Sequence, residues 1–567
     1  MFKTLPKDPQ VFLQWNWTQL KPFADELESR HLSKSTLVEW MMDWSDLSRV
    51  LSECYARLWV ATTQNTVDQE IQNRFNHFLD EVHTPWLAAN QGLKTKLIVS
   101  GLQPEIFRIP LENMQAEADI YREENLPFLM EEQKLINEYD GIIAAQTVIW
   151  QDEEVTTTQL QPVYQSLDRE MRETAWRLEM QRKLADRDRL NQLWIKILEL
   201  RNRITAHAGF SEYRAYKWKE LHRFDYYPED CAKFHDAIEK VVIPAARRIY
   251  EKRQKQLGLS RLHPWDLNVD PLGREALKPY QTILELEEKV SAIFHKIDPM
   301  LGNYFEVMRK QGLLDLENRK GKAPGAYCNN YDMVRLPFIF ENAVGLHTDV
   351  ATLLHEGGHA FHVFEEASIP YYHQLSVGME FAEVASMSIE LLAFPYLVAS
   401  EGGFYSEKEA ARAQIEHLEE TLLFWPYMAV VDAFQHWAYT NQADSMSPDN
   451  CDQKWSELWG RFMPGVDWSG LEDEMVTGWQ RKIHIFEVPF YYIEYGLASL
   501  GAIQVWANAM KDQKGSIEAY RRALALGGMV SIPELYSTAG ARFAMDAEIL
   551  YQVIGMIEHK ISELEQI

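Results

Sequence analysis

The chain has 567 residues, and its 57 Lys and Arg stand against 84 Asp and Glu, which gives a formal net charge of −27. This acidic balance argues against DNA or RNA as the ligand, because affinity for a phosphate backbone comes mainly from clustered Lys and Arg, so peptides and other neutral or cationic partners fit better. The composition, 46% hydrophobic and 25% charged, is that of an ordinary globular protein with a sizeable core, and the length allows either several domains or one large helical body.

The start of the chain and the cysteines bear on the compartment. Residues 1–20 lack a basic stretch followed by a continuous apolar core, so no secretory signal is expected. No apolar run approaches the roughly 18 residues needed to span a bilayer. The four cysteines, Cys54, Cys231, Cys328 and Cys451, form no CxxC pair. This pattern predicts a protein in the reducing cytoplasm, without a membrane partner.

The first third of the chain is predicted to be helical up to a short hairpin. Residues 35–146 carry apolar side chains at three- and four-residue spacing, which is typical of amphipathic helices. Residues 147–157 alternate, contain β-branched side chains and surround an acidic turn, which predicts a hairpin. We therefore expect an N-terminal helical region over residues 1–160 and a second region over residues 161–567.

The second region is also predicted to be mainly helical. Residues 161–208 carry charges of both signs and have neither Gly nor Pro after Pro162, which is typical of long helices exposed to solvent. Further helices are predicted at 229–257, 281–312, 406–442, 489–511 and 532–565.

Residues 331–340 interrupt the helical pattern. Because Pro337 lies inside this run and cannot donate a ladder hydrogen bond, we predict an edge strand. The strand precedes the most informative motif of the chain. Two interpretations remain open for it: an edge covered by the protein itself, or an edge that holds an extended peptide by strand addition.

That motif is His355-Glu356-Gly357-Gly358-His359. On a helix His355 and His359 lie one turn apart on one face, so both imidazoles can reach one zinc ion. Glu356 then lies beside the first ligand, where it can take a proton from a water that the metal activates. Two successive glycines each weaken a helix interior by about 1 kcal/mol relative to alanine, which indicates close packing or substrate approach. We favour a metal site over two incidental surface histidines.

A catalytic zinc site needs a third protein ligand and an open position. Glu380, Glu383 and Glu390 lie on one face of a predicted helix that is otherwise flanked by apolar residues. Three carboxylates on such a face repel each other unless a cation or hydrogen-bond donors lie opposite, and the alternative is an acidic solvated face. Glu383 is the central candidate ligand, and Glu380 and Glu390 are candidates for orienting the histidines.

These motifs carry a family resemblance. The block from His355 to His362, followed by Phe381-Ala382-Glu383-Val384-Ala385-Ser386, resembles the thimet oligopeptidase and oligoendopeptidase F family of zinc peptidases. Residues 346–350 are particularly similar to the oligoendopeptidase F branch, and the resemblance extends over roughly residues 160–560.

The resemblance implies a fold and a metal site. His355, His359 and Glu383 would be the ligands of one Zn²⁺ per chain, and Glu356 the general base. The implied fold class is mainly α: a large helical ellipsoid with a deep substrate channel and a small edge β-sheet next to the zinc-binding helix. The first 160 residues would wall one side of the channel.

A further match to the family lies at His484 and the tyrosine-rich residues that follow it. In the family such a histidine and helix face the zinc, which implies that His484, Tyr491 and Tyr495 contact the substrate and stabilise the tetrahedral intermediate. A Tyr hydroxyl can donate to a developing oxyanion. Pro489 suits the first turn of a helix on which Tyr491 and Tyr495 share a face. Tyr492 remains a rival to Tyr491, and without the resemblance the stretch would be interpreted as core.

Together these features predict a zinc-dependent metalloendopeptidase, an oligopeptidase that hydrolyses internal bonds of short peptides. One alternative is a related helical zinc carboxypeptidase. Another is a non-catalytic scaffold that binds peptides around a structural metal, which an apparently three-ligand site disfavours. The sequence leaves the oligomeric state open.

Overall fold

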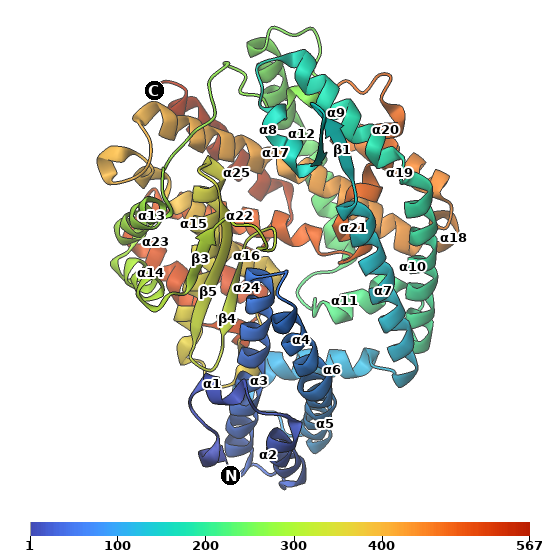
Figure 1. Ribbon diagram of the computed structural model, residues 1–567, viewed down its shortest axis with the longest axis vertical. Helices are drawn as coiled ribbons and strands as arrows, with labels where there is room; N and C mark the ends of the chain where they lie inside the picture. The colour runs from blue at the N-terminus through green and yellow to red at the C-terminus, as the bar shows by residue number, and fades with distance from the viewer. Residues whose placement is uncertain (1) are drawn as a thin grey trace.

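The computed structural model describes residues 2–567, and helices make up most of it (Figure 1). The N-terminal helices are α1 (Pro9–Phe12), α2 (Trp17–Ser29), α3 (Leu37–Gln64), α4 (Gln69–Phe78), α5 (Thr84–Ser100), α6 (Arg108–Ile120) and α7 (Leu126–Ala144). They are followed by β1 (Thr147–Trp150), β2 (Glu153–Thr156), α8 (Gln161–Tyr164), α9 (Arg169–Leu184), α10 (Arg187–Ala208), α11 (Tyr213–Glu220), α12 (Pro228–Gln256), α13 (Ile283–Ile297) and α14 (Pro299–Gln311).

The second half begins with a sheet. Its strands and the next two helices are β3 (Leu314–Glu317), β4 (Tyr327–Tyr331), β5 (Leu336–Ala343), α15 (His347–Glu365) and α16 (Met379–Leu392). The remaining helices are α17 (Glu407–Thr440), α18 (Gln442–Ser445), α19 (Pro448–Phe462), α20 (Glu472–Val476), α21 (Ile483–Phe486), α22 (Tyr492–Ala509), α23 (Gln513–Leu524), α24 (Ile532–Thr538) and α25 (Ala547–Leu564). The predicted mainly helical fold is thus confirmed. Among the described residues, none of the helices combines the length and the apolar character that crossing a bilayer requires.

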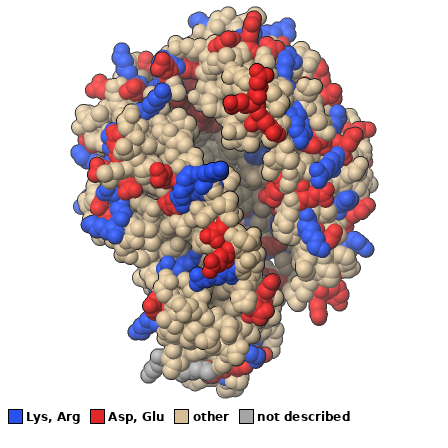
Figure 2. Space-filling view, in the orientation of Figure 1, with Lys and Arg blue, Asp and Glu red and all other residues tan. Residues whose placement is uncertain are grey.

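The arrangement places two walls on either side of a hollow. In Figure 1 the three-stranded sheet with α13, α14 and α15 lies on the left, and α7, α10, α18 and α19 lie on the right. The first helices, in blue, form the lower end, and α16 and α22 lie between the walls. Figure 2 shows the same face in space-filling form, with a deep hollow running down between the two walls.

The predicted hairpin is present as β1 and β2, which pair antiparallel from Thr147 opposite Thr156 to Trp150 opposite Glu153. The turn residues Gln151 and Asp152 both have positive φ, 54° and 69°. Two central residues with positive φ give the backbone twist that matches antiparallel strands.

Two predicted helices are each divided into two. The predicted helix at 281–312 is interrupted at Asp298, whose carboxylate accepts from Met300 N at 2.8 Å and caps α14. The predicted helix at 532–565 ends at Thr538, and after residues 539–546 a new helix, α25, begins, which Asp546 caps through Ile549 N at 3.0 Å. An Asp side chain that satisfies the free amides of a new helix start competes with continuation of the old one, and apolar periodicity alone does not reveal this.

The prediction of a single edge strand at 331–340 is wrong. The strand order is β3-β5-β4, so β5, which contains Pro337, is the central strand, and residues 332–335 form the turn between β4 and β5. Pro337 is tolerated because β3 pairs with β5 only from Ile339 onward, which leaves Pro337 with a partner strand on one side only. The outer strand next to α15 is β4.

The apolar residues of the N-terminal helices form their own cluster. Buried side chains from α1 to α6 pack around Trp40 and Trp44, whereas Tyr139 of α7 belongs to the large core that contains α10, α15, α16 and α22. Ala56 and Val60 of α3 and Ile120 of α6 also belong to the large core, so the first helices have an interior of their own that is packed onto the rest of the molecule.

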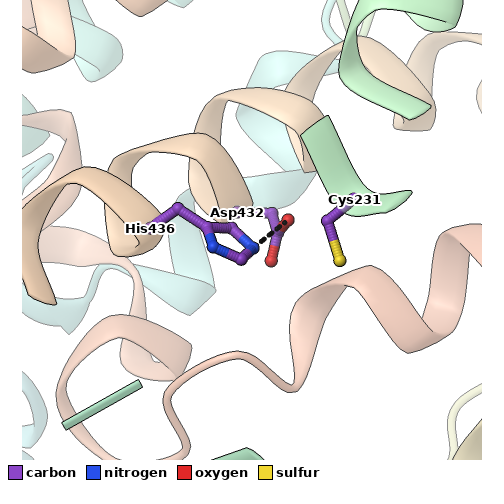
Figure 3. Close-up of side chains that lie close together, drawn as sticks. All are labelled: Cys231, Asp432 and His436. Carbon is purple, nitrogen blue, oxygen red and sulfur yellow. Dashed lines mark ion pairs between the residues drawn. The ribbon is translucent and has the colours of Figure 1, made fainter. Parts of the chain in front are cut away.

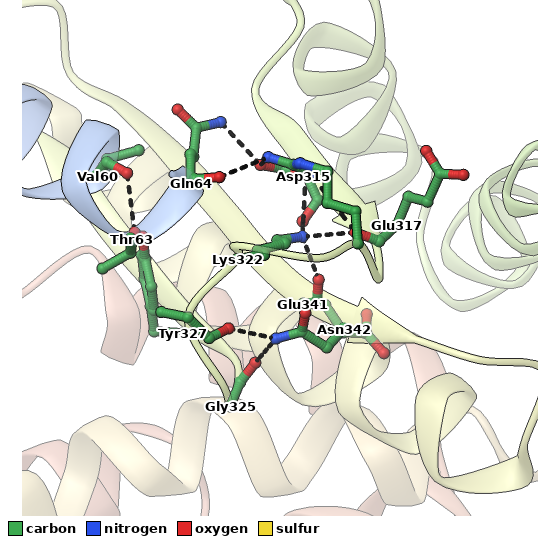
Figure 4. A network of polar contacts seen from close by, with 12 residues as sticks. Val60, Thr63, Gln64, Asp315, Glu317, Lys322, Gly325, Tyr327, Glu341 and Asn342 are labelled. Atoms are coloured by element: carbon green, nitrogen blue, oxygen red, sulfur yellow. Dashed lines mark hydrogen bonds and ion pairs between the residues drawn. The ribbon is translucent and has the colours of Figure 1, made fainter. Parts of the chain in front are cut away.

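Polar contacts join α3 to both ends of β4. At one end, Thr63 Oγ1 lies 2.6 Å from Tyr327 Oη, and Gln64 Nε2 donates to Asp315 Oδ2 at 2.8 Å (Figure 4). At the other end, the carboxylate of Glu53 accepts from the backbone amides of the β4–β5 turn, Met333 N at 2.7 Å and Val334 N at 2.9 Å. The N-terminal helices are thereby fixed to the sheet.

Candidate active site and metal centre

The helix α15 starts in a fixed position because Asp349, in its first turn, holds the junction with β5. The carboxylate oxygen Oδ2 accepts from Gly345 N at 2.7 Å and from Leu346 N at 2.8 Å, and the Tyr280 hydroxyl also donates to it. These amides precede the helix and have no partner within it. The strand and the helix that carries His355 are thus rigidly joined.

The two glycines of the motif lie at close contacts. A Cβ on Gly358 would lie 2.5 Å from Ser386 Cα and 2.6 Å from Ala385 O, which are backbone atoms of α16. A Cβ on Gly357 would lie 2.5 Å from Cζ of the Phe294 ring. The interpretation of the glycines as sites of close packing is confirmed, and the absence of a side chain at Gly358 lets α15 approach α16.

This approach brings His355, His359 and Glu383 together. The Nε2 atoms of His355 and His359 lie 3.4 and 3.7 Å from Glu383 Oε2, and the three donor atoms all lie within 4.8 Å of one another. Tetrahedral zinc with such ligands holds them about 3.4 Å apart, so this donor set fits a zinc ion. The two imidazole side chains remain 26% and 23% exposed, which leaves a side of the site open for a water or a substrate.

The imidazole of His355 is oriented from behind. Its Nδ1 lies 2.7 Å from Glu390 Oε1, so Nδ1–H donates to the carboxylate and Nε2 turns toward Glu383. His417 Nδ1, from α17, lies 3.7 Å from the other oxygen of Glu390. Such a carboxylate behind a ligating histidine fixes its tautomer and orientation. Glu380 is not in this arrangement, because it instead accepts from Tyr226 Oη at 2.8 Å. Sequence reasoning missed His417, which has no spacing relation to the motif.

The electrostatics of the site favour a proton acceptor at Glu356. Burial raises the pKa of Glu356 to about 7, and the neighbouring carboxylates of Glu383 and Glu390 add to this effect, while His355 opposes it. Burial disfavours charge on His355, yet the hydrogen bonds that its imidazole donates to the carboxylates of Glu383 and Glu390 hold its pKa well above the usual value. A pKa near neutrality lets Glu356 both take up and release a proton.

His484, Tyr491 and Tyr495 form an aromatic group opposite the metal site. The ring of His484 lies 5.9 Å from that of Tyr491 and 6.0 Å from that of Tyr495, and the two tyrosine rings lie 5.2 Å apart. Burial raises the pKa of both tyrosines, and the Glu383 carboxylate raises them further. Both phenols therefore lie within the electrostatic reach of Glu383.

Tyr492, the rival of Tyr491, lies differently. Its side chain is only 6% exposed and packs against the rings of Phe424 and Tyr427 from α17. The carboxylate of Glu383 is not among the groups that shift its pKa. Tyr492 therefore packs against α17 beside His484, whereas only Tyr491 and Tyr495 of the three tyrosines are affected by the charge of Glu383.

The helix predicted at 489–511 starts later, at Tyr492, and Pro489 lies in the turn that precedes it. The prediction of Pro489 in the first helical turn is therefore wrong. Phe490 has a φ of 68°, a conformation that breaks the helix start. Its amide donates to Gln435 Oε1 at 2.7 Å, and its carbonyl accepts from Arg223 Nη2 at 2.5 Å.

Two buried arginines hold the segment that carries these side chains. Arg223 is also paired with Glu494 Oε1 at 2.6 Å, and its Nε lies 3.8 Å from Glu380 Oε1. Arg201, which is 0% exposed, donates to the carbonyls of Ile485 and Phe486, just after His484. Residues far apart in sequence thus fix the backbone on both sides of the aromatic group, and no local pattern reveals them.

Replacing Arg223 by methionine is expected to lower the free energy of unfolding by about 3–5 kcal/mol, because it leaves buried carboxylates without a cation. Adding Glu494→Gln should restore part of the loss, since one of these charges is removed. Urea denaturation of both variants measures this. A double variant no more stable than Arg223→Met would show that the ion pair with Glu494 is not what Arg223 contributes.

A second cluster of possible ligands lies away from this site. Cys231, Asp432 and His436 have donor atoms within 4.8 Å of one another, on α12 and α17 (Figure 3). However, Asp432 Oδ2 is hydrogen-bonded to His235 Nε2 at 2.8 Å, and Arg214 Nη1 lies 3.3 Å from His436 Nδ1. A cation beside His436 disfavours a metal there, so we interpret the cluster as part of a buried polar contact in which Asp432 of α17 is bound to His235 of α12.

Several known proteins are similar to this chain. Oligopeptidase PepF of Bacillus subtilis (strain 168) is 24% identical over 344 residues, which cover 59% of this chain and 49% of that protein. An oligoendopeptidase F homolog of Borreliella burgdorferi is 23% identical over 335 residues, which cover 57% of this chain and 54% of that protein. The matched segment thus spans about half the length of these relatives.

A solved structure of Pz peptidase A with an inhibitor covers 99% of both chains, with a TM-score of 0.86 and 26% identity. The model of peptidase family M3 matches residues 163–553, which include all the site residues described above. Because that match covers well over half of the chain, the protein belongs to peptidase family M3.

Proposed function

We propose that this protein is a zinc-dependent endopeptidase that hydrolyses internal bonds of short peptides. The observation that carries the proposal is the meeting of His355, His359 and Glu383 at one point, with Glu356 beside them and Tyr491 across from them. The three donor atoms fit one Zn²⁺ with an open position, which is the arrangement of a catalytic rather than a structural site.

His355, His359 and Glu383 would hold the zinc, with Glu390 orienting the first histidine. A zinc ion at this point would act as a Lewis acid toward the scissile carbonyl and lower the pKa of water. Glu356 takes the proton from the attacking water and passes it to the leaving amine, for which its pKa of about 7 is suited. Tyr491 or Tyr495 donates its hydroxyl proton in a hydrogen bond to the carbonyl oxygen as negative charge develops, and His484 contacts the substrate.

The surroundings of the site support peptides as substrates. The deep hollow in Figure 2 would admit an extended chain and exclude a folded protein. The outer strand β4 borders it beside α15, where a peptide can add as a further strand. In this proposal residues 1–160 wall one side of the channel, since α3 is fixed to the sheet through its contacts with Tyr327 and Asp315.

A peptide digest with metal analysis tests the function. We expect about one zinc per chain, internal cleavage of peptides of about ten residues, and no cleavage of a folded protein of similar sequence. Loss of activity on chelation should be reversed by added zinc. Release of single C-terminal residues would instead identify a carboxypeptidase, and zinc binding without any cleavage would indicate a scaffold.

The tyrosines can be separated by substitution. We expect Tyr491→Phe or Tyr495→Phe to lower kcat by about 10²–10³-fold, because an oxyanion donor is lost. Tyr492→Phe, the matched control, should change kcat only slightly, since its ring packs against α17. Steady-state kinetics on one fluorogenic peptide gives the comparison. An equal loss in all three variants would contradict the assignment.

A further inference from the structure

Lys482 is a cation without a counter-ion. Within residues 2–567, no carboxylate forms an ion pair with its Nζ or shifts its pKa; the groups that lie against the ammonium are the rings of Tyr492, 3.9 Å from centroid to Nζ, and of Tyr427, at 5.4 Å. Burial lowers the pKa of Lys482 to about 8. Two tyrosine faces attract an ammonium group but do not replace the water it has lost.

Other lysines whose pKa burial lowers have oxygen partners; Lys96, for example, donates to the backbone carbonyls of Leu27 and Arg30. Burial also lowers the pKa of Lys183 and of Lys322, but each has a carboxylate partner, Glu179 and Asp315 respectively. In a chain with 84 Asp and Glu against 57 Lys and Arg, a half-buried lysine that faces only aromatic rings is an exception. This environment is suited to an anion that arrives from outside.

Lys482 is next to the aromatic group of the site. It precedes His484 by two residues and lowers the pKa of that imidazole, after burial. The ring of His484 lies 4.8 Å from Tyr492, over which the Lys482 ammonium sits, and its other neighbours, Tyr491 and Tyr495, face Glu383. Lys482 and His484 thus both lie against the ring of Tyr492, next to the two tyrosines that lie within the electrostatic reach of Glu383.

We propose that Lys482 binds a carboxylate of a peptide substrate that passes the aromatic group of His484, Tyr491 and Tyr495. The proposal rests on the proposed function and adds a substrate preference to it. The carboxylate is either the free C-terminus or the side chain of Asp or Glu, since both offer the same charged oxygens. A charge-assisted hydrogen bond to the ammonium group forms on binding.

The negative charges of the candidate active site also favour binding of an acidic group at Lys482. Glu383 is a candidate zinc ligand, and the carboxyl groups of Glu390 and Glu356 lie close enough to it to act on one another electrostatically. Together they repel a carboxylate placed directly at the scissile bond. A peptide with one acidic group is therefore best bound with that group at Lys482. The spacing between the cation and the metal site would then select the bond that is cut.

A matched pair of peptides tests this proposal. The peptides share an uncharged ten-residue sequence and end in a free carboxylate or in an amide, and a second series carries a single Glu or Gln at successive positions in the amidated form. We expect the wild type to cleave the best-placed carboxylate peptide with a kcat/KM about tenfold or more above that of its neutral twin. The C-terminal pair and the Glu series distinguish the two sources of the carboxylate.

Lys482→Met should abolish this preference while leaving kcat/KM of the neutral peptides nearly unchanged, and Lys482→Arg should restore part of it. Lys514→Met, at an exposed lysine of α23, is the control and should keep the preference. The proposal is overturned if the wild type cleaves carboxylate and neutral peptides with the same kcat/KM, or if Lys482→Met lowers kcat/KM of both kinds of peptide by the same factor.

Calorimetric binding of the same peptides separates this inference from the function itself. If the zinc-loaded protein cleaves nothing but still binds carboxylate peptides more tightly than amides in a Lys482-dependent way, the peptidase assignment fails and the carboxylate site stands. If it cleaves peptides with no dependence on Lys482, the peptidase assignment stands and the carboxylate site fails.

Discussion

Replacing Gly358 by alanine is expected to force α15 away from α16 and thereby to impair both stability and metal binding. The new methyl group would lie 2.5 Å from Ser386 Cα and 2.6 Å from Ala385 O, and backbone atoms of a buried helix cannot move aside as a side chain can. Overpacking of this kind costs about 1–3 kcal/mol, and often more where backbone must shift. Because Glu383 lies on α16 and the histidines lie on α15, the donor atoms would also separate.

Thermal denaturation and zinc titration of Gly358→Ala measure the two effects. Gly555→Ala, in α25, is the matched control, since a Cβ there meets nothing within 4 Å; it should be neutral or stabilising by up to about 1 kcal/mol. Gly357→Ala should cost less than Gly358→Ala, because it meets the ring of Phe294, a side chain that can adjust. A Gly358→Ala protein with wild-type stability and zinc affinity would refute the close approach of the two helices.

Glu356→Gln is expected to reduce kcat by about 10²–10⁴-fold, the usual contribution of a general base, and to leave zinc binding intact. The amide keeps the shape of the side chain but cannot accept the proton of the attacking water. Glu356 is not among the atoms that surround the metal position, which come from His355, His359 and Glu383. Metal content and steady-state kinetics of the purified variant measure both expectations.

Two further substitutions show whether the loss is specific. Glu383→Gln should lose both zinc and activity, because a ligand is weakened. Glu390→Gln should lower zinc affinity about 10–100-fold, the usual effect of changing a partner of a ligating histidine. If Glu356→Gln lost its zinc as Glu383→Gln does, the division of roles within the motif would be wrong.

The candidate site could be predicted from the sequence where its geometry is local. The spacing of His355 and His359 is one helical turn, and Glu383 lies on the acidic face of an otherwise apolar helix, so both elements are visible in short windows. The two glycines also indicated a close contact, although only the structure shows that α16 is the partner of Gly358.

The features that sequence reasoning missed depend on distant partners. Arg223 donates hydrogen bonds to Phe490 and Glu494, which lie more than 260 positions away in the sequence. His417 contacts the carboxylate of Glu390 from a separate helix. No periodicity connects such residues. The prediction of an edge strand is wrong for the same reason. The strand β3 lies outside the predicted segment 331–340, and its pairing with β5, which makes β5 central, begins only at Ile339.

The attachment of α3 to β4 restricts how the molecule can move. Glu53 binds the turn at one end of the strand, and Thr63 binds Tyr327 at the other. A hinge between the N-terminal helices and the sheet would have to break both ends at once, so these parts behave as a single rigid body. Cross-linking α3 to β4 should therefore leave peptide entry unhindered.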